Sequence, residues 1–390
     1  MFLPEQLPEL RRQIRAQAAR DFGVLDELLA HARALGDGVR PIRPRSATSV
    51  ALTAADGGNN AVAFNPFSLQ IIRVVDSHGR ELFLDVVSPT MDVAELSHGH
   101  LARGTPLGRL MSDLGASSLR ELSPVLTGRS PGWVDVYREL CEWATLYDLV
   151  CHHDFAADTL VVRDGLLRST VFAGDMLLRM GALMRTAIDR TAHGSCRRVW
   201  LCGLAKHSAV LDRYRLALAL AGVFDRATPC FASVPAALLE NAYRHRGYAG
   251  SAGAAGAAGR AGAAGAAGSA GADGSTAATR GGQSLGEMYF VRFGPHAGDP
   301  VWTADVLTWQ AADVQAIFGY LQADAAAGFP VPFYPLSLQQ ADAHSRVGDL
   351  DVEIIEDSLV EAVRDLVGRD RAHVVDALRL STDVAARRYA

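Results

Sequence analysis

The segment from Ser49 to Asn60, SVALTAADGGNN, decides how the fold is interpreted. Ser49 to Ala55 contains no charge, glycine or proline, and this pattern predicts a short buried strand. We expect the strand to end at Asp56, where Gly57 and Gly58 let other groups approach closely. A carboxylate at such a position is suited to hold a cation, although Asp-Gly is also the commonest dipeptide in plain turns.

The same arrangement, an apolar strand followed by a polar side chain, occurs twice more. Residues 159–163 are followed by Asp164, and residues 198–204 are followed closely by Lys206. Ligands collect at the carboxyl ends of strands in open α/β sheets. The three strand ends therefore indicate one site that contains Asp56, Asp164 and Lys206.

Lys206 is also unusual in composition, because it is the only lysine in the chain. The other 37 of the 38 basic residues are arginine. An ammonium is a compact point charge, whereas a guanidinium is a planar fork. Either position 206 requires the ammonium, or this lysine has survived by chance.

The overall composition indicates a protein of two or three domains that functions in the cytoplasm. Its 390 residues are 49% hydrophobic and 21% charged, with no apolar run as long as a membrane span and no signal peptide in MFLPEQLPELRRQ. The five cysteines form no CxxC pair, and Cys151-His152-His153 lacks a second ligand pair at zinc-finger spacing. The net charge of −5 gives no support for a generally basic nucleic-acid binder, so any DNA contact must be local.

Hydrophobic periodicity predicts an α/β fold in four segments. Residues 1–45 form a helical, arginine-rich arm, whose charges serve either as a solvated face or as phosphate contacts. Residues 46–248 and 283–390 form the two parts of the main domain, and the Ala/Gly-rich segment 249–282 is a disordered insertion. The expected strands are 49–55, 68–75, 81–87, 159–163, 198–204, 288–293 and 301–307, and the main expected helices are 131–152, 171–191, 309–326 and one that begins near Ala209.

The order of these motifs resembles that of the NurA nuclease family. The matching residues are Asp56-Gly57, Glu142 on a helix, Asp164-Gly165-Leu166, Lys206, and Tyr334-Pro335-x-x-Leu338-x-x-Ala341-Asp342. The resemblance covers residues 46–245 and 285–365. It implies an RNase H-like mixed sheet, flanked by helices, whose first three strands are antiparallel. It also implies a manganese- or magnesium-dependent DNA nuclease, usually a homodimer, that acts with a HerA-type hexameric ATPase in DNA end resection, repair or anti-phage defence.

Position by position, the resemblance implies four metal ligands and one electrophilic residue. Asp56, Glu142, Asp164 and Asp342 match the ligands, with Glu139 and His344 as alternatives to Glu142 and Asp342. Two hard divalent ions held by carboxylates activate water and stabilise the leaving oxygen in phosphodiester cleavage. Lys206 would then place a positive charge on the scissile phosphate. Its other possible role is to pair with a ligand aspartate when no metal is bound.

The structural alternatives are simple. Glu142 could be an ordinary surface acid of its helix, Asp342 could cap the next turn, and Tyr334 is more typical of a core residue than of a DNA-stacking one. Two other functions also fit the sequence: a non-catalytic subunit that docks on an ATPase ring, and a metal phosphohydrolase that acts on small nucleotides.

Overall fold

The computed structural model describes residues 6–46, 50–64, 66–126, 133–246, 283–346, 348–368 and 371–377. The predicted insertion at 249–282 and the first two residues of the helix expected at 131–152 lie outside these ranges. The chain forms two compact units. The first contains residues 1–52, 155–170 and 188–336, and the second contains residues 53–154, 171–187 and 337–390.

The first unit contains a mixed sheet, which confirms the predicted α/β class. Its strands follow the order β1-β8-β10-β11-β7-β5, in which β5 and β7 are parallel and the other neighbours are antiparallel. Two short strands, β6 and β9, pair separately. The strands are β1 (Arg40–Pro41), β5 (Thr159–Asp164), β6 (Arg168–Ser169), β7 (Val199–Ala205), β8 (Cys230–Ser233), β9 (Gln283–Ser284), β10 (Gly286–Arg292) and β11 (Trp302–Leu307).

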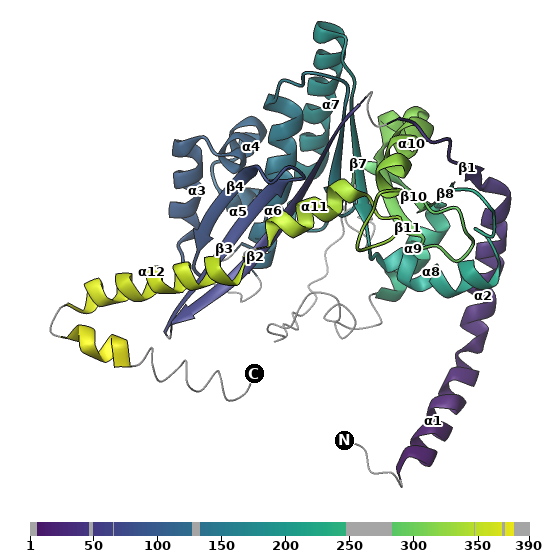
Figure 1. The fold of residues 1–390 in the computed structure, drawn as a ribbon, viewed down its shortest axis with the longest axis horizontal. Coiled ribbons are helices and arrows are strands. Elements are labelled where there is room, and N and C mark those ends of the chain that lie inside the picture. The colour runs from purple at the N-terminus through teal and green to yellow at the C-terminus, as the bar shows by residue number, and fades with distance from the viewer. Residues whose placement is uncertain are drawn as a thin grey trace. The chain divides into compact units, whose positions relative to one another are not determined.

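Helices cover both faces of this sheet (Figure 1). They are α2 (Phe22–Leu35), α8 (Ala209–Leu220), α9 (Ala236–Arg246) and α10 (Val314–Ala325), the last preceded by a 3₁₀ turn (Thr308–Asp313). Helix α1 (Leu7–Arg20) precedes α2 and does not cover the sheet. Successive side chains of a strand point to opposite faces. Phe290 of β10 packs in the cluster formed with α2, α8 and α9, whereas Tyr289 meets Phe318 of α10 at 5.5 Å between ring centroids.

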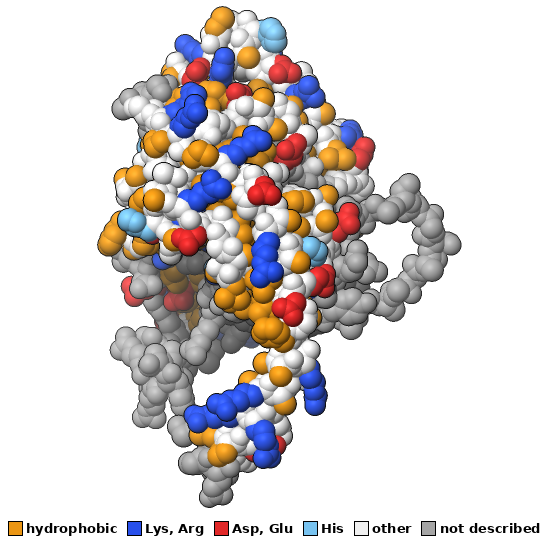
Figure 2. Space-filling model, turned by 90° about the vertical axis from the view of Figure 1, so that its right-hand side faces the viewer, with side chains coloured by type: hydrophobic (Ala, Val, Ile, Leu, Met, Phe, Trp, Pro, Cys, Tyr) orange, Lys and Arg blue, Asp and Glu red, His pale blue; other side chains and the backbone are white. Residues whose placement is uncertain are grey.

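The N-terminal segment is helical as predicted, and its two helices differ in burial. Leu28, Ala32 and Leu35 of α2 belong to the core of the first unit. No residue of α1 is buried, and basic side chains are visible along it in the lower part of Figure 2. Only α2 is therefore held by core packing.

The second unit is built on the antiparallel strands β2 (Ala51–Phe64), β3 (Phe67–Asp76) and β4 (Glu81–Val87), of which β2 starts in the first unit. This confirms the expectation that the first long strands are antiparallel. Helices α3 to α6 lie on one side of these strands and α12 on the other (Figure 1). The helices are α3 (Val93–Arg103), α4 (Pro106–Leu114), α5 (Leu119–Leu122), α6 (Trp133–His152), α11 (Leu336–Ser345) and α12 (Asp349–Val367), and α7 (Met176–Ser195) passes from the second unit into the first.

A buried polar network, which we call the Asp85 network, joins strand β4 to helices α3 and α6. It consists of Asp85, His100 and Tyr137. The Tyr137 hydroxyl donates to Asp85 Oδ2 at 2.6 Å, and His100 Nε2 lies 2.6 Å from the same hydroxyl. Burial raises the pKa of Asp85, but the hydrogen bonds of the network outweigh this and lower the pKa below its ordinary value of 3.8.

The prediction that the first strand ends at Asp56 is wrong. Strand β2 continues to Phe64, and Asp56, Gly57 and Gly58 pair in register with Val75, Val74 and Arg73 of β3. Ladder pairing with β3 satisfies the backbone here, so tertiary context overrides the turn propensity of Asp-Gly. The glycines instead let other segments pack closely against the strand, since a Cβ at Gly58 would clash with the carbonyl oxygen of Ser345.

The other two strand ends are confirmed. Strand β5 ends at Asp164, and Lys206 directly follows β7. Helix α8 begins at Ala209, and the Ser208 side chain caps it by accepting from the Leu211 amide. Among the described residues, no helix combines the length and apolarity needed to cross a membrane.

Candidate functional site

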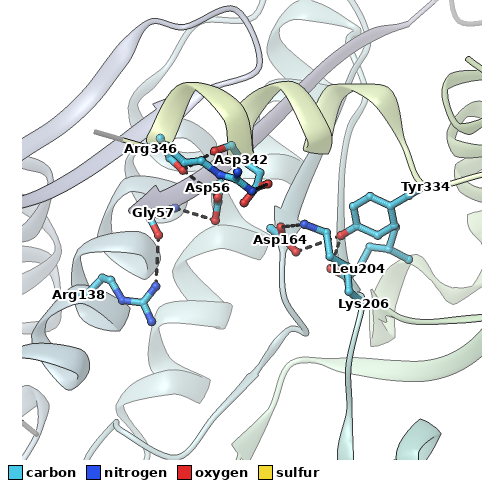
Figure 3. Close-up of polar contacts among 10 residues, drawn as sticks. Asp56, Gly57, Arg138, Asp164, Leu204, Lys206, Tyr334, Asp342 and Arg346 are labelled. Carbon is cyan, nitrogen blue, oxygen red and sulfur yellow. Dashed lines mark hydrogen bonds and ion pairs between the residues drawn. The ribbon is translucent and has the colours of Figure 1, made fainter. Parts of the chain in front are cut away.

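In the first unit, three side chains converge where β5 and β7 end (Figure 3). The two strands are parallel with Asp164 opposite Leu204, so Asp164 and Lys206 emerge at the same edge. Lys206 Nζ lies 3.3 Å from Asp164 Oδ2, and the Tyr334 hydroxyl donates to Asp164 Oδ1 at 3.0 Å. The ammonium also lies 5.0 Å from the centroid of the Tyr334 ring. We call these three residues the Asp164 cluster.

Close packing surrounds the tyrosine of the Asp164 cluster and the loop that follows Asp164. Tyr334 has no exposed surface, and its ring meets that of Trp302 edge to face at 5.0 Å. The loop after Asp164 turns at Gly165, whose φ of +119° favours glycine. A Cβ at Gly203 of β7 would lie 2.5 Å from the Gly165 carbonyl oxygen, so the absence of a side chain there lets the loop pack on the strand.

A buried ion pair anchors the far end of this loop. Arg168 donates to both carboxylate oxygens of Asp305, each at 2.8 Å. Asp305 has no exposed surface, and the Arg168 side chain is 11% exposed. Bidentate charge-assisted bonds fix both position and orientation, so Arg168 holds the chain four residues after Asp164.

In the second unit, Asp56 and Glu142 lie on either side of Gly57. The Asp56 carboxylate accepts from the Gly57 amide at 2.9 Å and from the Ser345 hydroxyl at 3.0 Å. A Cβ at Gly57 would lie 2.6 Å from Cγ and Oε1 of Glu142, so this glycine leaves the space that the glutamate occupies. Arg138 joins the two elements by donating to the Gly57 carbonyl at 3.2 Å and to Glu142 Oε1 at 3.3 Å.

The position of Glu142 confirms that this residue of α6 faces inward. Its side chain is 15% exposed, in contrast to an ordinary surface acid. The side chain that lies against Gly57 is that of Glu142, which follows its ion-pair partner Arg138 by one turn of the helix. This geometry favours Glu142 over Glu139 as the acid that acts with Asp56.

Helix α11 brings Asp342 to the same region of the second unit. Ser345, which donates to Asp56, also donates to the Asp342 carbonyl at 3.0 Å. The Asp342 carboxylate accepts from Arg346 at 2.8 Å. The ring of His344 lies instead near Gly79, where a Cβ would be 3.4 Å from Nδ1. The choice between Asp342 and His344 as a metal ligand stays a prediction.

Several of these contacts could not be found from sequence motifs. Ser345, Arg138 and the Arg168–Asp305 pair were not predicted, because each depends on contacts between distant segments. Tyr334 was expected in the core; it is buried as expected, but its hydroxyl also contacts Asp164. Its position in the Tyr-Pro motif was the only signal available.

The donor set fits hard divalent cations. In the described part of the chain, no group of three or more His, Cys, Asp or Glu side chains lies close enough to hold a metal ion. Mg²⁺, however, is commonly held by one or two carboxylates together with waters and substrate phosphates. Asp56 and Glu142, which both lie next to Gly57, supply two carboxylates in the second unit, and Asp164 supplies one carboxylate beside an ammonium in the first. The prediction that Asp56 and Asp164 share a pair of ions concerns both units and stays a prediction.

Comparison with known proteins gives similar folds at low similarity. No protein-family model matches the chain, and no curated protein matches it. The structure of the NurA nuclease from Sulfolobus solfataricus is 12% identical with a TM-score of 0.37, over 94% of this chain and 99% of that one. A NurA structure bound to dAMP and manganese is 11% identical with a TM-score of 0.39, over 95% and 99%. Another, with manganese, is 10% identical with a TM-score of 0.38, over 91% and 100%. All three identities are at most 12% and all three TM-scores are below 0.4, so these likenesses lead to no conclusion about the activity of this chain.

Proposed function

We propose that the protein is a metal-dependent DNA nuclease that hydrolyses phosphodiester bonds. The observation that carries this proposal is the Asp164 cluster. There the only lysine of the chain lies 3.3 Å from a strand-end carboxylate whose second oxygen is fixed by a buried tyrosine. A carboxylate and an ammonium held side by side can serve a metal ion and a phosphate in the same place.

Each side chain has a distinct role in this proposal. Asp56, Glu142, Asp164 and Asp342 would hold Mn²⁺ or Mg²⁺, which supplies an activated water and stabilises the negative charge that develops on the phosphate. Lys206 binds and orients the scissile phosphate as a positive point charge. When no metal is bound, the same ammonium balances the charge of Asp164.

Ser345 and Arg138 act as positioning residues. Ser345 fixes one oxygen of Asp56, and Arg138 holds Glu142 against the backbone of Gly57. These contacts restrict both carboxylates before any ligand binds. A preorganised set of charges stabilises a transition state without the energetic cost of reorganisation during the reaction.

The direct test is digestion of linear DNA by purified protein with Mn²⁺. We expect Asp56→Ala and Asp164→Ala to lower the rate at least a hundredfold. Glu240→Ala, which removes an exposed acid of α9, should leave the rate unchanged. Lys206→Met should lose activity, and Lys206→Arg should restore only part of it because the guanidinium is larger and planar. Full activity in both aspartate variants would refute the proposed site.

The proposal extends to assembly as a homodimer that acts with a HerA-type hexameric ATPase. Its support is that α1 has no buried residue and that Ile14 and Phe22 are 58% and 57% exposed. Deletion of residues 1–20 leaves α2 and its core contacts in place. We expect the deletion variant to keep its fold by circular dichroism but to lose co-purification with the ATPase. Unchanged co-purification would refute a role for α1 in this contact.

A further inference from the structure

A pocket of about 810 Å³ opens beside Lys206 in the first unit. One wall is helix α8, from which Leu211, Arg215, Leu218 and Ala219 line the space. Residues spaced by three, four, seven and eight positions lie on one face of a helix, so these side chains form a continuous wall. The other wall is formed by residues 297–301 of the loop that joins β10 to β11 and by Trp302, the first residue of β11.

The inner surface of the pocket is apolar and well ordered. Leu211, Leu218, Phe224 and Trp302 line it and are all less than one-tenth exposed. Trp302 is fixed in turn, because its indole nitrogen donates to the Phe333 carbonyl at 2.8 Å. Such a floor suits a flat, largely apolar group, and the volume lies within the range of pockets for small ligands.

Charged side chains line the same pocket in two groups. Lys206, His207 and Arg215 are the basic groups, and Lys206 also belongs to the Asp164 cluster. Asp225 and Asp299 are the acidic groups. A ligand that combines a phosphate, a flat ring and hydrogen-bond donors on that ring matches all three features. A nucleotide has this chemistry.

We infer that this pocket receives the base of a nucleotide next to the scissile phosphate, unstacked from the DNA strand. The inference rests on the proposed nuclease function, since Lys206 then contacts both the phosphate and the entrance of the pocket. The base packs on the apolar floor, and the N–H donors at its edge, of which every base has at least one, face Asp225 and Asp299, whose Oδ2 also accepts from the His296 amide at 2.7 Å. A base paired in a duplex is not available to such a pocket, so the enzyme selects frayed or single-stranded nucleotides.

The occupant is a nucleotide within a DNA strand rather than a separate apolar molecule, because Lys206 belongs both to the pocket lining and to the Asp164 cluster. Stacking and apolar contacts bind bases of any sequence, since every base has a π-face. The pocket therefore confers a preference for unpaired nucleotides and little preference among sequences.

The test fills the pocket with a larger side chain on α8 and measures the binding of oligonucleotides. The assay contains no metal, so its result does not depend on DNA cleavage. Ala219→Trp places an indole in the pocket, whereas Leu220→Trp is the matched control, since Leu220 is 60% exposed and does not line it. Each full-length variant is titrated in EDTA with single-stranded oligonucleotides that carry 2-aminopurine at one end or the other. This probe brightens when it unstacks from its neighbours.

We expect wild type and Leu220→Trp to bind at least one probe with increased fluorescence and equal Kd. Ala219→Trp should raise that Kd about tenfold, which corresponds to ~1.4 kcal/mol. An oligonucleotide with abasic residues in place of the terminal bases should bind wild type and Ala219→Trp equally. Circular dichroism of Ala219→Trp establishes that a loss of binding does not reflect unfolding.

Three results would overturn the inference. They are equal probe binding by Ala219→Trp and wild type, an equal effect of Ala219→Trp on the abasic strand, and competition by free dAMP at the same concentration as the strand. The last result would assign the pocket to free nucleotides. Because the assay contains no metal, failure of the nuclease proposal appears separately, as the absence of DNA digestion with Mn²⁺.

Discussion

Replacement of Asp305 by alanine should strongly destabilise the first unit, because the substitution leaves Arg168 buried without its counter-charge. Asp305 has no exposed surface and accepts two bonds of 2.8 Å from Arg168. Removal of one partner from a buried ion pair costs about 3–5 kcal/mol. Since a domain is typically stable by only about 5–15 kcal/mol, this loss is a large fraction of the total.

The same reasoning predicts that removal of both charges costs far less. Burial raises the pKa of Asp305 above 3.8 although Arg168 opposes this shift, whereas the hydrogen bond and charge of Asp305 raise the pKa of Arg168 in spite of its burial. Desolvation and attraction therefore nearly balance in this pair. Apolar residues of similar volume then replace the pair at little cost. We expect Arg168→Met/Asp305→Leu to lie within about 1.5 kcal/mol of wild type.

The assay is urea unfolding followed by tryptophan fluorescence, with Trp200 and Trp302 reporting on the first unit. A double-mutant cycle compares the two single variants with the double variant. The reasoning is refuted if Asp305→Ala alone costs less than about 1 kcal/mol, or if the two single effects add in the double variant.

Three further predictions concern other contacts. Gly57→Ala displaces the Glu142 carboxylate, so DNA digestion with Mn²⁺ should fall at least tenfold while the urea midpoint changes little; loss of both together would contradict this. Tyr334→Phe removes the hydroxyl that holds Asp164 and should lower the free energy of unfolding in urea by about 1 kcal/mol. It should also raise the Mn²⁺ concentration needed for half-maximal digestion, and an unchanged Mn²⁺ requirement would contradict this. Because the folded pKa of Asp85 is lowered, its stabilisation is complete above about pH 4 and is lost as the pH falls below that value. Wild type should therefore lose stability more steeply than Asp85→Asn in acid titrations followed by circular dichroism, and parallel curves would contradict this.

The parts of the fold that the sequence predicted correctly have strong local signals. Strand β4 has the predicted bounds, Glu81–Val87, since a polar turn on one side and proline soon after the other limit it. Helix α6 ends at His152 as expected from its apolar stripe. Strands β5 and β7 are almost wholly buried, and continuous apolar segments of this length are typical of parallel neighbours.

The parts that were missed depend on non-local contacts. Strand β8 has only four residues, Cys230–Ser233, between Pro229 and Pro235, and it gains its ladder from β1 and β10 on either side. Asp56 was placed at a strand end because Asp-Gly-Gly is a turn signal. Pairing over the full length of β3 keeps it inside a long strand. No local pattern encodes either result.

The geometry at Lys206 weakens the interpretation that this lysine is a chance survivor. A surface lysine retained by chance would need no specific surroundings, yet this side chain is only 30% exposed and lies between a carboxylate and an aromatic face. An ammonium can approach Asp164 as a point charge while its stem packs against Tyr334, whereas a guanidinium presents a broader plane that must match its partners edge-on. In a chain that uses arginine at its other 37 basic positions, the compact cation is thus found beside a carboxylate that a buried tyrosine holds in place. The retained lysine and the buried tyrosine each contact one oxygen of Asp164, so together they hold a positive charge close to this carboxylate.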